Sequence, residues 1–143
     1  MIADLDQTIE KLLTTELPIK NGEIDIAFDQ PKREWSARLS RPTLNFFLFD
    51  IRENNVLRQH QWEKMAQLPG NGRTPNIQQK RTPFRIDCHY IITSWASNPK
   101  DEHRLLSRTL MTLFRYPVLP ESCLAGDIKN QPYKIQAKLV THD

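Results

Sequence analysis

The sequence predicts an α+β fold, with a single sheet of about four to six mainly antiparallel strands and two helices packed on it. Two segments place apolar residues at helical spacing, and several shorter apolar segments rich in β-branched and aromatic residues lie between and after them. The chain has 143 residues, which suits one hydrophobic core. We therefore expect residues 1–143 to form a single domain.

The first helix is expected between residues 2 and 17. Asp4 followed by Gln7 resembles a capping box, and Pro18 ends the pattern. The positions that share its inner face are Leu5, Ile9, Leu12 and Leu13.

The strands are expected in five places. Residues 23–29 alternate apolar and acidic side chains, whereas residues 43–51 are apolar on both faces, as in a strand covered on both sides. Asn54-Asn55 predicts a tight turn into a return strand near 56–62, because asparagine tolerates positive φ. Residues 84–96 form a third strong strand, and residues 133–140 alternate again. The polar segment 63–83 is expected to be a projecting hairpin or an assembly loop.

The second helix has a clear start. Asn98 is a natural N-cap, Pro99 suits the first helical position, and Asp101 and Glu102 complement the positive end of the helix dipole. Tyr116-Pro117 ends it. Its predicted buried stripe consists of Leu105, Leu106, Thr109, Leu110, Leu113 and Phe114.

The ends of the chain carry two further indications. The N-terminus is acidic, unlike a signal peptide, and no run of about 18 apolar residues occurs, so no membrane association is expected. Thr141-His142-Asp143 follows the last predicted strand without a turn or cap, so we expect the natural chain to continue past Asp143.

The residues that invite a metal or nucleophile hypothesis are Asp87, Cys88, His89 and His103. On a strand, Asp87 and His89 point to one side and Cys88 to the other, and no pair of ligands has zinc spacing. Cys88 is best explained as a small core residue, and two cysteines cannot build a disulfide framework, which fits a reducing cytosol. No phosphate-binding or hydrolase motif occurs. We predict no enzyme activity, no catalytic residue, no cofactor and no metal.

Charge is spread unevenly along the chain. The net charge is +3, but residues 1–30 carry two basic against seven acidic residues (net −5), and residues 31–85 carry eleven against four (net +7). These blocks could neutralise each other within one fold, or the basic block could bind nucleic acid. Alternatively, they could lie on opposite sides of a subunit and attract neighbouring copies head to tail into a ring.

Three segments together carry a family resemblance: residues 41–54 (RPTLNFFLFDIREN), residues 85–96 (RIDCHYIITSWA) and the helix start 101–106 (DEHRLL), which is closed by Tyr116-Pro117-Val118-Leu119-Pro120. In this order they resemble the terminator or cap proteins of extracellular contractile injection systems, which are phage-tail-like particles of the antifeeding-prophage type. The likeness runs from the first helix to the strand at 133–140. None of the three segments is a catalytic signature.

The resemblance implies a phage tail-terminator-like fold and a structural role. Such proteins form a hexameric ring that caps the inner tube and contacts the last layer of sheath, so homo-oligomer, tube and sheath contacts are expected. It also implies assembly in the cytoplasm, followed by release as part of an extracellular particle. Another adaptor of the same particle, such as a baseplate component, and a basic nucleic-acid-binding module are the alternatives.

A ring of this kind needs two different, complementary patches on each subunit. The acidic and basic blocks offer such a pair. The candidate assembly residues are Arg41, Arg52, Glu53, Asn54, Arg58, Arg73, Lys80 and Arg81.

Overall fold

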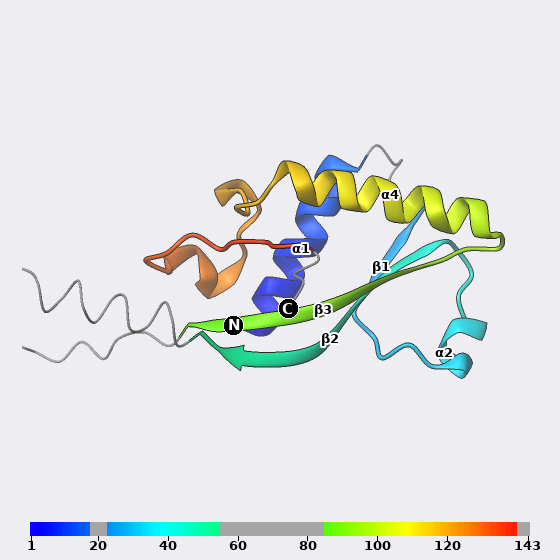
Figure 1. Cartoon of the computed structure of the whole chain (residues 1–143), viewed down its shortest axis with the longest axis horizontal. Helices are drawn as coiled ribbons and strands as arrows, with labels where there is room; N and C mark the ends of the chain where they lie inside the picture. Colours follow the sequence, from blue (N-terminus) through cyan, green and yellow to red (C-terminus); the bar gives the residue numbers. More distant parts are fainter. Residues whose placement is uncertain (18–22, 55–84, 140–143) are drawn as a thin grey trace, which may run out of the picture. The chain divides into compact units, whose positions relative to one another are not determined.

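The computed structural model describes residues 1–17, 23–54 and 85–139 (Figure 1). Within them it contains the helices α1 (Ile2–Glu16), α2 (Arg33–Ala37) and α4 (Pro99–Arg115) and the strands β1 (Asp25–Ala27), β2 (Thr43–Glu53) and β3 (Ile86–Trp95). Two short 3₁₀ helices follow, η1 (Glu121–Cys123) and η2 (Gly126–Asn130). The α+β class is confirmed.

The chain divides into two units. Residues 1–47 and 91–143 form the first, and residues 48–90 form the second. The first unit holds the helices, β1, the start of β2 and the end of β3. The second unit holds the end of β2 and the start of β3, which form a two-stranded ribbon.

The sheet in the described residues has three strands in the order β1-β2-β3, so the predicted count of four to six is too high for this part of the chain. β1 pairs with β2 in parallel, with Ile26 opposite Leu44, and β3 runs beside β2 in the opposite direction (Figure 1). The sheet is therefore mixed and not mainly antiparallel. The crossover that contains α2 causes this, because it carries the chain back to the end at which β1 began.

Two other predicted strands have different outcomes. The return strand near 56–62 and the segment 63–83 lie outside the described residues. The segment 133–139 alternates as predicted, with Ile135, Ala137 and Leu139 half-buried, but it joins no strand of the sheet. It forms a single antiparallel bridge between Val118 and Gln136. Pro117 accepts the N–H of Ala137 but has no N–H to donate, so this pairing cannot extend into a full ladder.

The core of the first unit joins α1 to α4. Leu12 of α1, Leu113 of α4, Leu119 and Cys123 form a buried cluster. Cys123 thus has the core role that the sequence suggested for Cys88, which is only half-buried.

The two long helices begin differently. Asn98 caps α4 as predicted, because its Oδ1 accepts the N–H of Asp101 at 3.0 Å. Glu102 adds a second tie, since its carbonyl accepts from the Ser94 hydroxyl at 2.7 Å. α1 begins at Ile2 without a side-chain cap, so the capping box predicted at Asp4 and Gln7 is wrong.

Asp4 instead fastens α1 to the 3₁₀ segment near the C-terminus. Its carboxylate accepts the N–H of Asp127 at 3.3 Å, and the buried Thr8 hydroxyl accepts the N–H of Ala125 at 3.1 Å. Gly126 between them has φ +57°, and a Cβ there would meet the Asp4 carboxylate. The positive φ favours a glycine at this position, and a larger residue would also have to displace the Asp4 side chain.

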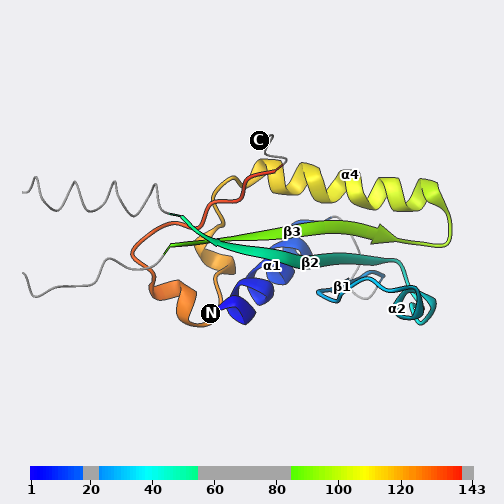
Figure 2. The ribbon, with the colours of Figure 1, turned by 60° about the horizontal axis from the view of Figure 1, so that its bottom comes forward.

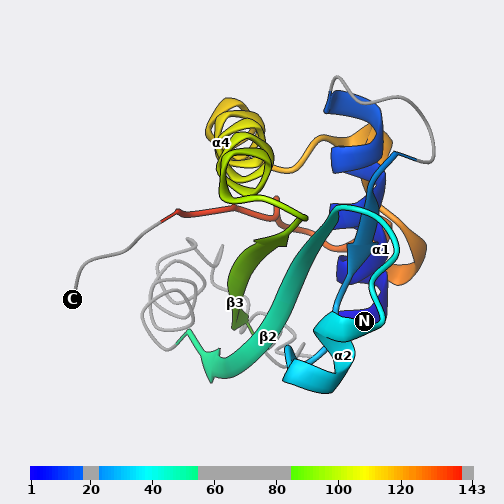
Figure 3. The same ribbon diagram turned by 90° about the vertical axis from the view of Figure 1, so that its right-hand side faces the viewer.

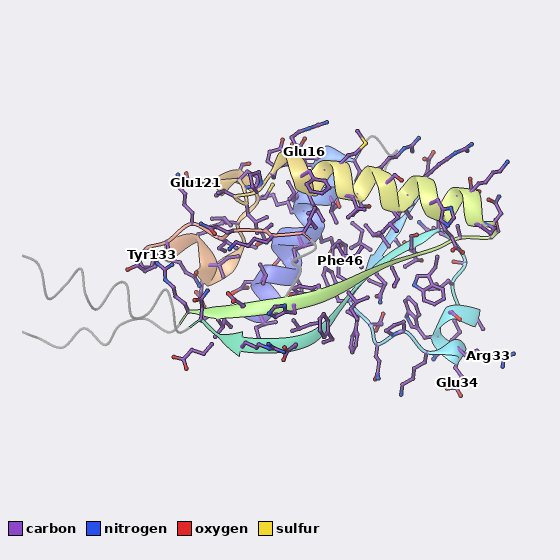
Figure 4. All side chains as sticks on the ribbon, viewed as in Figure 1. Glu16, Arg33, Glu34, Phe46, Glu121 and Tyr133 are labelled. Carbon is purple, nitrogen blue, oxygen red and sulfur yellow. The ribbon has the colours of Figure 1, made fainter. Side chains whose placement is uncertain are left out.

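Glu16 at the end of α1 interacts with Tyr116 at the end of α4. Glu16 accepts a hydrogen bond from Tyr116, and this bond, followed by desolvation and the charge of Glu16, raises the pKa of Tyr116 above its ordinary value of 10.0. Figure 4 shows Glu16 at the end of α1.

This raised pKa predicts a pH dependence. Because the folded state holds the Tyr116 proton more tightly, the contribution of the bond is complete below pH 10 and is lost as the pH rises beyond it. We expect the thermal midpoint of the protein to fall more steeply above pH 10 than that of Tyr116→Phe. Thermal melts from pH 8 to pH 11.5 measure the difference, and parallel curves for the two proteins would contradict it.

Candidate assembly interface

The described end of the β2–β3 ribbon carries three of the predicted interface residues: Arg52, Glu53 and Asn54. The Asn54 N–H donates to the carbonyl of Arg85 at 2.7 Å, and its side-chain amide lies 3.3 and 3.4 Å from the two carboxylate oxygens of Asp87. Asn54 therefore holds the two strands together here.

The charge of Arg52 is balanced within its own strand. Its Nε pairs with the carboxylate of Asp50, two residues earlier, and its side chain is 74% exposed. An exposed ion pair of this kind contributes about 0–1 kcal/mol. The side chains of this pair could therefore be drawn into another contact at little cost.

Apolar side chains share this ribbon with the charged ones. Phe49, Ile51 and Ile86 are between 40% and 51% exposed. The ring of Phe49 lies 6.0 Å from that of His89, at an interplanar angle of 60°. Clustered exposed apolar residues beside polar ones are typical of protein-contact surfaces.

β2 is buried where it begins and exposed where it ends. The prediction that it is covered on both faces therefore holds only for its first half. The apolar residues of its second half are the ones available to a partner.

Arg41 is not part of the ribbon. It precedes the other end of β2, and its Nη1 lies 3.9 Å from Oδ1 of Asp25 in β1. A second acid of the N-terminal block, Asp29, accepts the indole N–H of Trp35 at 3.0 Å. Here a residue of the basic block faces an acid of the N-terminal block, so at this point the two blocks neutralise each other within one fold.

The remaining predicted interface residues, Arg58, Arg73, Lys80 and Arg81, lie outside the described residues. Two of the residues that suggested metal chemistry have other partners. Asp87 accepts a hydrogen bond from the Asn54 side chain, and the ring of His89 packs against that of Phe49. Among residues 1–17, 23–54 and 85–139, no group of three metal-ligating side chains comes together. No helix in the same ranges is long and apolar enough to cross a membrane.

Sequence reasoning missed the outer face of α4. Phe114 was predicted to be buried, but it is 67% exposed, and Met111 is 64% exposed. The side chains of α4 that are buried include Thr112, which was not predicted. The sequence does contain a pattern that indicates this face. Residues spaced by four and three positions lie on one side of a helix, and this spacing links Lys100, Arg104, Ser107, Met111 and Phe114.

The comparisons with known proteins agree with this architecture. The family model of the Pvc16 N-terminal domain matches residues 4–143. Among the curated proteins no match is found. The chain is similar to a cryo-EM structure of an extracellular contractile injection system, the PVC sheath/tube terminator in its extended state, with a TM-score of 0.57 and 26% sequence identity.

That match covers 88% of this chain and 42% of the terminator chain. The chain thus spans less than half the length of the terminator it matches. The resemblance to terminators of contractile injection systems is confirmed over nearly all of the sequence. The chain belongs to the Pvc16 N-terminal domain family.

Proposed function

We propose that this domain is part of a cap protein that terminates the inner tube of a contractile injection particle and contacts the last layer of sheath. The observation that carries the proposal is the structural match to a sheath/tube terminator over 88% of the chain. The exposed mixture of apolar and charged residues on the β2–β3 ribbon supports a role in protein contact. Neither a baseplate component nor a nucleic-acid-binding protein is among the similar proteins found.

The proposed partners are further copies of the chain, arranged as a hexameric ring, together with the tube and sheath proteins. We propose no catalysis and no nucleic-acid contact, because the similar structure is a sheath/tube terminator. Part of the positive charge is also balanced within the chain, since Arg41 and Arg52 face Asp25 and Asp50. In this proposal residues 1–143 act as one terminator domain. Particles assemble in the cytoplasm and carry the cap outside when they are released.

Particles made without this protein test the proposal. If it caps the tube, electron micrographs of particles from a deletion strain should show tubes of widely varying length, because nothing stops their growth. Supplying the intact protein from a plasmid should restore a narrow length distribution. Tubes of normal length and normal ends in its absence would rule out the terminator role.

Arg52→Glu tests the contribution of the ribbon end. The substitution places a second negative charge beside Asp50 and inverts the charge offered to a neighbour, so we expect ring formation to fall strongly and tube lengths to broaden. Lys134→Glu, at an exposed position of the 133–139 segment, is the matched control and should leave both unchanged. Native mass spectrometry and electron microscopy measure the two effects. Normal rings with Arg52→Glu would remove the ribbon end from the interface.

A further inference from the structure

The outer face of α4 combines exposed apolar residues with positive charge. Its stripe begins with Lys100 and Arg104 and ends with Met111 and Phe114, which are 64% and 67% exposed. In Figure 4, nitrogen-tipped side chains project from the edge of α4 that is farther from the strands. Such a stripe on the outside of a helix is unusual for a surface that faces only water, because amphipathic helices normally turn their apolar side inward.

The positive charges on this face are largely unbalanced. Arg104 lies 3.8 Å from Asp101, but Arg108 and Arg115 form no ion pair within the described residues. No acidic residue occurs between Glu102 and Glu121. The face therefore favours a partner that brings acidic groups.

The same chain carries an acidic edge that fits this description. In the described part of the chain β1 is an edge strand of the sheet, and three exposed acids lie on it or beside it in the sequence: Glu23 before it, Asp25 within it and Asp29 after it. Glu23 has no ion pair among the described residues, and Asp25 has one, to Arg41 at 3.9 Å. As an edge strand, β1 also leaves backbone carbonyls that arginine side chains can use as acceptors.

Both surfaces carry more than one charge. From Lys100 to Arg115 the helix rises about 22 Å, and Glu23 and Asp25 are two residues apart in the sequence. A helix laid on the acidic edge could therefore place more than one arginine opposite an acid.

The two surfaces also belong to different parts of the first unit. Figures 2 and 3 place α4 on the side of β3, whereas β1 lies beyond β2 at the other edge of the sheet. One subunit cannot bring them together. A head-to-tail contact between copies can, and repetition of such a contact closes a ring.

We propose that the outer face of α4 docks on the acidic β1 edge of a second copy of this chain. The inference rests on the ring of the proposed function and names two further surfaces of its subunit contact, in addition to the ribbon end. Burial of Met111 and Phe114 would supply the apolar part of the contact, and the arginines would fix its direction.

Charge reversal on each surface, alone and together, tests the proposal in the assembled particle and in purified protein. Two double variants should each fail to form the ring: Arg104→Glu/Arg108→Glu on α4 and Glu23→Lys/Asp25→Lys on the β1 edge. Native mass spectrometry of the purified protein and electron microscopy of the tube ends measure the loss. In a 1:1 mixture of these two proteins, alternating copies bring together the wild-type surfaces at one contact and the two reversed surfaces at the next, so the mixture should regain the ring. The chain with all four substitutions should regain the ring. Lys129→Glu and Glu121→Lys, exposed on the 3₁₀ helices, are the controls and should assemble normally.

The contradicting results are distinct from one another. Normal rings with Arg104→Glu/Arg108→Glu would remove α4 from the contact. Loss of rings with the α4 variant but not with the β1 variant would assign α4 to a different protein of the particle or to another part of a longer chain, and would overturn docking on a second copy. Loss with both and no recovery with all four substitutions would overturn the pairing. All three outcomes leave the cap role intact, because that role fails only if particles without the protein keep normal tubes.

Discussion

Leu12→Ala is expected to lower the free energy of unfolding by about 3–4 kcal/mol, because it removes a fully buried side chain from the centre of the core. Leu12 is 0% exposed and contributes the α1 side chain to the buried cluster with Leu113, Leu119 and Cys123. The cavity would separate α1 from α4 and from the C-terminal segment at the same time. Urea unfolding followed by circular dichroism measures the change.

The matched control is Gln7→Ala, on the exposed side of the same helix. It should change the free energy of unfolding by less than about 0.5 kcal/mol. A loss below about 1 kcal/mol for Leu12→Ala would show that α1 is not packed in a common core with α4.

Asn45→Leu is expected to lower the free energy of unfolding by about 2–4 kcal/mol, although it places an apolar side chain in the interior. The Asn45 side chain is 0% exposed. Its Oδ1 accepts the N–H of Asp29 at 3.0 Å, and its Nδ2 donates to the carbonyl of Asp29 at 2.9 Å. Leucine leaves both backbone groups without these partners and releases the segment that follows β1.

Asn45→Asp separates the hydrogen bonds from side-chain volume. Its protonated carboxyl can donate to the carbonyl of Asp29 and accept from the N–H, whereas the ionised form cannot donate and places a charge in the core. Burial raises the pKa of such a carboxyl. The free energy of unfolding of the variant should therefore be closer to that of the wild type near pH 4 than near pH 7. Asn130→Asp, at an exposed position, is the control. A loss of stability that does not depend on pH would contradict this assignment.

The main elements could be predicted because their signals are local. Asn98 and Pro99 mark the start of α4 through a cap that needs only the next few residues. The alternation at 23–29 and the apolar run at 43–51 likewise identify β1 and β2. Asp4 also matched a local motif, but its carboxylate bonds Asp127, a partner that no local pattern reveals.

The parallel pairing of β1 with β2 could not be predicted, because it depends on α2. This helix has five residues and none of them is buried, so it has no apolar stripe to reveal it. Figure 4 shows Arg33 and Glu34 projecting from it. Without α2, the two strands would be expected to pair as a hairpin.

The candidate site was predicted less completely than the fold. Summing charge over blocks identified a basic region, but pairs such as Arg41 with Asp25 and Arg52 with Asp50 depend on three-dimensional placement. The block 86–143 is nearly neutral in total, and this concealed the arginines of α4. Phe114 was assigned to the core because apolar residues usually lie there, but its side chain is 67% exposed.

A cryo-EM reconstruction of intact, extended particles carrying this protein tests the central claim most directly. We expect a closed ring of copies of this domain at the end of the inner tube, in contact with the final sheath layer. Density for the domain at the baseplate, along the shaft, or nowhere on the particle would contradict it.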